Sequence, residues 1–364
     1  MSPLTGIEYS VKGLGDFGTT NVEFDWSYDS QKIAFAYSPN KEIEAFYVYS
    51  KIAMIDLNTN EIRHFNTDTF ESNPRFSPDG NWIGFLKRVG SKLYGINNAV
   101  AIRSIDGLFE KILSETPNGG PFLAGPNLLG WNKEGTGLIT FEPKQTKFDL
   151  YLVPIDGQAP IALIQDKAFI REPSLSQDKK AISFVKQSPD TAPEVYFSSL
   201  EAFNPIRLSA INEKMSRFSI AKTEKIAWES EGFTIEGLLT YPKDYEPGKK
   251  YPLLLVIHGG PMGFFDESYL GVPFAYPIAV FSEEGYFILR TNPRGSTGYG
   301  KAFRMANFND WGGKDMHDIL RGVDYVIAQG FVDENRLGVM GWSYGGYMTS
   351  WIISQTNRFK AASM

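Results

Sequence analysis

The spacing of apolar residues changes near residue 223 and divides the chain into two parts. Before that point, short strands with alternating apolar positions follow polar turns that usually contain Asp. The clearest units are WSYDSQKIAF, FSPDGNWIGF, WNKEGTGLIT and LSQDKKAISF, which start at Trp26, Phe76, Trp131 and Leu175, 44 to 55 residues apart. A second strand-turn-strand pattern follows each unit. Four strands per repeat with little helical signal predict the blades of a β-propeller.

The four clear repeats occupy residues 1–222, which we expect to form the propeller domain. A single blade cannot bury both faces of its sheet, so the repeats must stack around an axis. The aromatic residues of the repeats are then expected in the blade core rather than along a ligand-binding surface. A two-sheet sandwich built from hairpins is the alternative.

Residues 223–364 follow a different pattern. The continuous apolar runs at 253–257, 287–289 and 337–340 are typical of strands covered on both faces. Between the last two runs, apolar residues at helical spacing over 316–327 predict a helix that ends near Gly330. Strands that alternate with helices predict a doubly wound, mostly parallel α/β sheet.

The segment Gly341-Trp342-Ser343-Tyr344-Gly345 fits the G-x-S-x-G nucleophile elbow, in which a serine lies on a strained turn between a strand and a helix. The flanking glycines Gly341 and Gly345 remove Cβ atoms that would clash at the turn. We predict Ser343 as a catalytic nucleophile, with the backbone N–H of Tyr344 as one donor of an oxyanion hole.

The second oxyanion donor is expected from an earlier strand-to-helix loop. His258-Gly259-Gly260-Pro261 follows the 253–257 strand, where such a loop belongs. We expect His258 to support this loop rather than to act as a base. Met262, Phe264 and Phe265 come next, and either substrate-pocket walls or buried packing would explain them.

The remaining candidates have weaker signals. Asn292 to Gly300 resembles a phosphate loop but lacks the Lys-Ser/Thr ending, so we expect no nucleotide. Arg294 either holds this loop by hydrogen bonds or lines the rim of the active site. His64 is expected on the propeller surface. His317, between Asp315 and Asp318, is expected in a solvated helix start, and we expect neither a metal nor a cofactor.

Composition excludes several classes of protein. The 364 residues contain 42% hydrophobic and 21% charged residues, which are globular values. A net charge of −6 without a dense basic patch argues against a nucleic-acid partner. No cysteine is present, which excludes disulfides and a cysteine nucleophile. Without a membrane-spanning run or a secretion signal near the start, we expect a cytoplasmic protein with no membrane contact.

The HGGP turn, NPRGSTGYG, DWGGKDMHDI and GWSYGGYM together resemble the prolyl oligopeptidase family of serine peptidases. Its acylaminoacyl-peptidase and dipeptidyl-peptidase-like branch is the most similar. The resemblance implies a β-propeller that caps an α/β-hydrolase domain and admits short peptides as substrates. It further implies that Ser343 is acylated and that Gly260 and Tyr344 donate the oxyanion N–H groups.

One feature departs from the family pattern. The fold places its triad in the order serine, acid, histidine, but the 21 residues after Ser343 contain no Asp, Glu or His. FKAASM would begin the next strand in the family. We therefore expect a C-terminally incomplete α/β-hydrolase domain, inactive alone, whose acid and histidine come from a missing segment or from a second chain.

Three functions remain as hypotheses. The first is a propeller-capped serine peptidase, favoured because a relic has no reason to keep both the elbow and the oxyanion turn. The second is an esterase of the same fold. The third is a non-catalytic propeller that binds peptides or proteins and retains a relic hydrolase segment.

Overall fold

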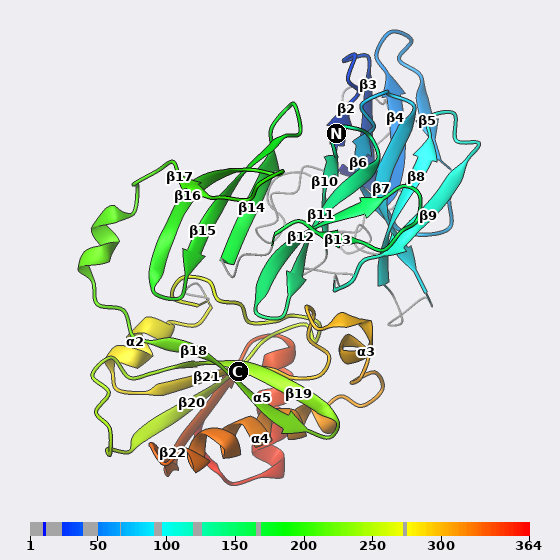
Figure 1. The fold of residues 1–364 in the computed structure, drawn as a ribbon. Helices are drawn as coiled ribbons and strands as arrows, with labels where there is room; N and C mark the ends of the chain where they lie inside the picture. The colour runs from blue at the N-terminus through cyan, green and yellow to red at the C-terminus, as the bar shows by residue number, and fades with distance from the viewer. Residues whose placement is uncertain are drawn as a thin grey trace.

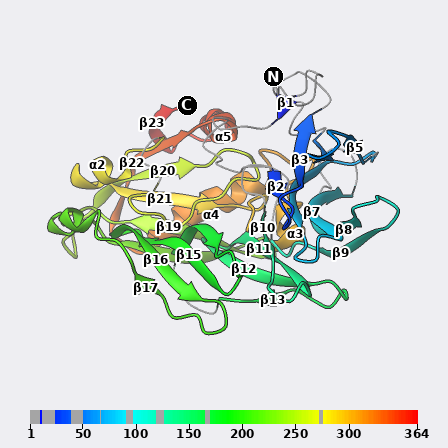
Figure 2. The ribbon, with the colours of Figure 1, turned by 90° about the horizontal axis from the view of Figure 1, so that it is seen from above.

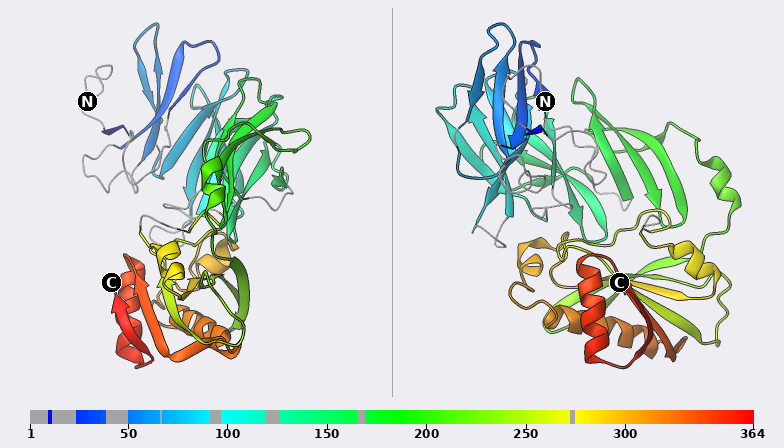
Figure 3. Two further views of the ribbon diagram at one scale, coloured as in Figure 1. Left: turned by 90° about the vertical axis from the view of Figure 1, so that its left-hand side faces the viewer. Right: turned by 180° about the vertical axis from the view of Figure 1, so that it is seen from behind.

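The computed structural model describes residues 10–11, 24–38, 50–65, 67–90, 97–118, 126–164, 169–271 and 275–364. Four antiparallel sheets come first in the chain, and a mixed six-stranded sheet follows. Figure 1 shows the antiparallel sheets above the mixed sheet, and Figure 3 shows the same two layers from two further sides.

The four predicted repeats form four separate sheets. The first contains β1 (Ser10–Val11), β2 (Phe24–Trp26), β3 (Lys32–Ser38), β4 (Lys51–Asp56) and β5 (Ile62–His64). The second contains β6 (Glu71–Phe76), β7 (Trp82–Val89), β8 (Asn97–Ser104) and β9 (Glu110–Glu115). The third contains β10 (Asn127–Trp131), β11 (Gly137–Lys144), β12 (Lys147–Pro154) and β13 (Ile161–Ala162). The fourth contains β14 (Phe169–Leu175), β15 (Ala181–Ser188), β16 (Thr191–Ser199) and β17 (Ile206–Arg207).

These sheets pack face to face in chain order, as propeller blades do (Figure 2). One apolar cluster lies between the first and second sheets, another between the second and third, and another between the third and fourth. Trp131, 2% exposed, is among the core residues of the second of these clusters. The sandwich alternative is wrong, because four sheets rather than two stack in succession, with a separate apolar cluster between each neighbouring pair.

The polar turns of the repeats have a shared hydrogen-bond pattern. In the first repeat Ser27 Oγ donates to Asp29 Oδ1 at 2.6 Å and accepts from the N–H of Lys32 at 2.8 Å. In the fourth, Ser176 Oγ donates to Asp178 at 2.7 Å. Because the aspartate closes the turn into the second strand, the Asp signal recurs with the repeat.

The mixed sheet begins near residue 223, where the spacing of apolar residues along the sequence changes. Its order is β18 (Thr223–Ser230), β19 (Phe233–Thr240), β21 (Phe287–Asn292), β20 (Tyr251–Ile257), β22 (Val332–Gly341) and β23 (Phe359–Ser363). The pairings from β21 to β23 are parallel, whereas β19 pairs antiparallel with both β18 and β21. The FKAASM segment forms the expected strand, β23, at the edge of the sheet.

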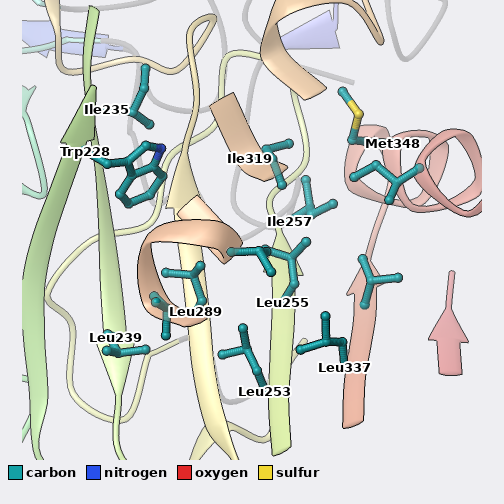
Figure 4. Packing of buried hydrophobic residues seen from close by; sticks show 14 of the residues in the cluster. Trp228, Ile235, Leu239, Leu253, Leu255, Ile257, Leu289, Ile319, Leu337 and Met348 are labelled. Atoms are coloured by element: carbon teal, nitrogen blue, oxygen red, sulfur yellow. The ribbon is translucent and has the colours of Figure 1, made fainter. Parts of the chain in front are cut away.

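Helices cover both faces of this sheet. They are α2 (Ile278–Glu283), α3 (Gly300–Arg304), α4 (Lys314–Ala328) and α5 (Tyr344–Gln355), and a 3-10 helix, η2 (Glu213–Arg217), precedes the sheet. Figure 4 shows the cluster in which Ile319 of α4 and Met348 of α5 pack on Leu255. On the opposite face Ile278 of α2 packs on a second cluster. The continuous apolar strands follow from this double coverage.

The loops at the carboxyl ends of β20 and β21 touch the third blade. The N–H of Gln145, in the β11–β12 turn, donates to the carbonyl of Gly298 at 2.7 Å. In the same turn Thr146 accepts from the N–H of Glu267 at 2.9 Å, and its hydroxyl donates to that carboxylate at 2.7 Å. The propeller therefore packs against the loops that contain the candidate site residues.

Candidate active site

Ser343 lies between β22 and α5 with φ 58° and ψ −121°. This backbone conformation is strained for a residue with a Cβ, and such strain is typical of functional turns. A Cβ on Gly341 would lie 2.3 Å from the carbonyl oxygen of Gly345, and a Cβ on Gly345 would lie 2.1 Å from that of Ile257. Only glycine fits at either position, because the clashing atoms belong to the backbone.

The loop after β20 reaches Ser343. A Cβ on Gly259 would lie 3.3 Å from Ser343 Cβ and 3.8 Å from its Oγ. Within the part of the chain that the structure describes, the N–H groups of Gly260 and Tyr344 donate no hydrogen bond. The serine, the glycine turn and the start of α5 are thus brought together, although 82 residues separate Ser343 from Pro261, the end of the turn.

His258 supports the turn from a buried position. Its Nδ1 lies 2.8 Å from the carbonyl oxygen of Gly259, and its Nε2 lies 2.9 Å from Ser296 Oγ. Burial lowers the pKa of His258 to about 4, so the ring is neutral at neutral pH. Because a carbonyl can only accept, the neutral ring carries its proton on Nδ1. The single hydroxyl proton of Ser296 is shared between His258 Nε2 and the carbonyl of Pro293, which lies 2.7 Å from Ser296 Oγ.

The other two histidines lie elsewhere. His64, expected on the propeller surface, lies on β5, is half-buried and bonds through Nδ1 to the hydroxyl of Tyr37 at 2.9 Å. His317 on α4 lies 3.0 Å from Glu231. Ser343 Oγ has no hydrogen-bond partner among the described residues, which include all three histidines of the chain. No base within these residues is placed to accept its proton.

The first turns of α4 are not a solvated helix start, and that expectation is wrong for both carboxylates. Asp315 and Asp318 are each 0% exposed. Asp318 accepts from Arg294 Nε at 2.8 Å and from its Nη2 at 2.7 Å, and also from its backbone N–H. The carboxylates face inward because buried hydrogen-bond donors lie on that side of the helix. The helical spacing of the sequence alone does not reveal these donors.

Arg294 holds its loop by these hydrogen bonds. Its guanidinium is 3% exposed, donates to the carbonyl of Ser230 at 3.1 Å and lies over the ring of Phe233. The hydrogen bond that Arg294 donates to Asp318 raises the pKa of Arg294, so the pair is charged. The loop itself is buried from 291 to 298, and Gly298 packs against the propeller.

Asp315 is a site residue that the sequence analysis missed. Its carboxylate accepts a hydrogen bond from the hydroxyl of Tyr344, the residue after the nucleophile, and from the N–H groups of Gly312 and Met316. Burial raises the pKa of Asp315, and the Tyr344 hydroxyl opposes this effect. No local sequence pattern predicts the contact between Asp315 and Tyr344, since 29 residues separate them.

The three residues after the HGGP turn differ in their surroundings. Phe265 is 2% exposed and packs edge-on against His258 and Tyr276, so its contacts are those of core packing. Phe264 is half-buried, with its ring centroid 5.6 Å from that of Phe148 in the third blade. Met262 is half-buried as well, and its carbonyl accepts from Thr297.

No group of three or more His, Cys, Asp or Glu residues in the described part of the chain is arranged to hold a metal ion. No helix that the structure describes is long and apolar enough to cross a membrane.

Residues 273–364 match the family model described as "Prolyl oligopeptidase family". The peptidase YuxL of Bacillus subtilis is 37% identical over 251 residues, which are 66% of this chain and 37% of that protein. Dipeptidyl-peptidase 5 of Schizosaccharomyces pombe is 28% identical over 355 residues, 96% of this chain and 49% of that protein. The resemblance inferred from the motifs is thereby confirmed. The chain spans between about a third and a half of the length of these relatives.

Two solved structures show the same fold. A puromycin-hydrolyzing peptidase of Mycobacterium tuberculosis has a TM-score of 0.67 at 19% identity, covering 93% of this chain and 60% of that one. Dipeptidyl peptidase 4 of Porphyromonas gingivalis has a TM-score of 0.63 at 15% identity, covering 95% and 59%. At these identities the likeness concerns the fold alone.

Proposed function

We propose that this chain forms the propeller and the nucleophile-bearing part of a serine peptidase of the prolyl oligopeptidase family. The observation that carries the proposal is the strained backbone of Ser343, at φ 58°, with Gly259 beside it. We assign residues 1–222 to the propeller domain and 223–364 to an α/β-hydrolase domain, and the substrates are short peptides.

In the proposed reaction Ser343 Oγ attacks the carbonyl carbon of the scissile bond while a general base takes its proton. The carbonyl oxygen becomes negatively charged and accepts from the N–H groups of Gly260 and Tyr344, where the start of α5 also favours negative charge. Collapse of this intermediate breaks the C–N bond and leaves the amine with the proton. Water then hydrolyses the acyl-enzyme.

The base and the acid that orients it are assigned to residues outside these 364, because no described histidine reaches Ser343. His258 is excluded as the base since both of its ring nitrogens are engaged, with Gly259 and Ser296. We further propose that the propeller restricts access to small substrates. The contacts of the β11–β12 turn with the loops after β20 and β21 support this role.

The test compares two substrate classes in the complete protein that carries this chain. N-acylated and N-terminally free short peptides report peptidase activity, and p-nitrophenyl esters report ester hydrolysis. Peptide hydrolysis that Ser343→Ala abolishes and Ser350→Ala preserves supports the proposal. Ser350 is the matched control because it lies on the exposed side of α5 and its hydroxyl bonds only to the carbonyl of Gly346 and to Met364 Sδ.

Two outcomes would replace the proposal. Ester hydrolysis without any peptide hydrolysis would indicate an esterase of the same fold. Peptide binding without hydrolysis of either substrate would indicate a non-catalytic propeller module.

A further inference from the structure

Arg290 is a buried cation whose guanidinium lies over the ring of Phe265, 5.9 Å from its centroid, but has no hydrogen-bond or ion-pair partner among the described residues. It lies in β21, between two other strands of the mixed sheet, and is 1% exposed. Its Nε and Nη1 have no hydrogen-bond partner, and no carboxylate forms an ion pair with it in the described part of the chain. Burial lowers the pKa of Arg290 to about 10, which leaves it charged at neutral pH. Buried charges in proteins are normally paired.

Two other buried arginines follow that rule. Arg294 is paired with Asp318, and Arg103 with Glu71. Arg304, 1% exposed, donates to the side-chain oxygen of Asn97 at 2.8 Å. Arg290 differs from these three arginines because it has no hydrogen-bond or ion-pair partner among the described residues.

The carboxylate of Asp266, whose charge acts on Arg290, forms its hydrogen bonds with other groups. Asp266 opposes the effect of burial on the pKa of Arg290. Its Oδ2, however, accepts from Arg171 Nη1 of the fourth blade at 3.3 Å, and its Oδ1 accepts from the N–H of Ser268 at 3.1 Å. Asp266 thus links the propeller to the loop after β20 and makes no hydrogen bond to Arg290.

Arg290 lines a cavity of about 40 Å³ at the junction of the two domains. A single water needs roughly 10 to 15 Å³ of such space, so the cavity has room for a small ion. Pro189 of the fourth blade, the connecting residues 219–221 and Ile278 of α2 also line it. Glu283 does as well, but its carboxylate pairs with Lys243 at 2.6 Å and is 53% exposed.

A glycine keeps the space beside the guanidinium open. Gly271 has φ +72°, and a Cβ there would lie 2.6 Å from Arg290 Nη1. Any side chain at 271 would displace the guanidinium.

We propose that Arg290 binds a small inorganic anion of the size of chloride in this cavity. The anion compensates the buried charge, and its position between the fourth blade, the connection and the mixed sheet makes it a link between the domains. The size of the cavity selects a small anion over a large one. This site is independent of the proposed peptidase chemistry.

The experiment is thermal unfolding of the 364-residue chain in sodium chloride against sodium gluconate at constant ionic strength. Gluconate is too large for the cavity. Binding to the folded state alone raises Tm, by about 3 °C or more at saturating chloride. Arg290→Met is expected to lose this difference, whereas Arg304→Met, the buried and hydrogen-bonded control, is expected to keep it.

An equal response to chloride in Arg290→Met, or no difference between the two salts in the parent chain, would overturn the proposal. If Arg290→Met does not fold, crystals of the parent chain grown with bromide decide the question. An anomalous-scattering peak within hydrogen-bond distance of the Arg290 guanidinium supports the site, and its absence there refutes it.

Discussion

The buried imidazole of His258 gives the stability of the protein a defined dependence on pH. The ring has an ordinary pKa near 6.5 when exposed, and burial lowers it to about 4 in the folded protein. As pH falls below 6.5, the unfolded chain binds a proton that the folded chain does not. This proton stabilises the unfolded state, so the folded protein loses stability until pH reaches the folded pKa.

The size of the effect follows from the shift. Each pKa unit corresponds to about 1.4 kcal/mol, so the difference between 6.5 and about 4 corresponds to about 3 kcal/mol. The loss occurs between pH 6.5 and pH 4 and levels off below that window. His258→Gln removes the titrating group and retains an amide that can hydrogen-bond to Ser296 Oγ, and it is expected to lack this component.

The assay is urea unfolding of both chains between pH 7 and pH 4, followed by tryptophan fluorescence. The advantage of the parent over His258→Gln should shrink by about 3 kcal/mol across this range, because the carboxylates titrate alike in both chains. Ser296→Ala, which keeps the histidine buried, should retain the pH dependence of the parent. Parallel stability curves for the parent and His258→Gln, or an NMR titration of the His258 ring centred near pH 6.5, would refute the reasoning.

Two further predictions concern buried carboxylates behind the elbow. Tyr344→Phe deprives Asp315 of its hydroxyl donor and should destabilise the chain by about 1 to 3 kcal/mol in urea unfolding; an unchanged midpoint would show that the contact contributes nothing. Asp318→Asn leaves the buried Arg294 without its counter-charge and should cost about 3 to 5 kcal/mol. A loss below 1 kcal/mol, measured in the same way, would contradict this account of the loop after β21.

Local patterns were sufficient for the strands and for the elbow. The repeats starting at Trp26 and Phe76 predicted hairpins because alternation and turn residues act within about ten positions, and the structure has strands on both sides of each turn. The helix predicted to end near Gly330 runs over Lys314–Ala328, with Gly330 at φ +88°. The glycines of the elbow were predictable for the same reason, since the turn itself requires them.

Contacts between distant segments were not predictable. Asp315 and Asp318 have the spacing of an ordinary helix start, and nothing near them announces Tyr344 or Arg294 as partners. Arg290 lies in a run, FILRTN, that predicts a buried strand, but the sequence does not reveal that its charge is unpaired. The partners of these side chains depend on which elements pack together, and the periodicity of apolar residues does not determine that packing.

The most direct test of the central claim is covalent labelling of the complete protein that carries this chain. A fluorophosphonate reacts with an activated serine, and peptide mapping by mass spectrometry identifies the modified residue. The account predicts a single adduct on Ser343 and none after Ser343→Ala. An adduct on a different serine, or peptide hydrolysis that persists in Ser343→Ala within tenfold of the parent rate, would contradict it.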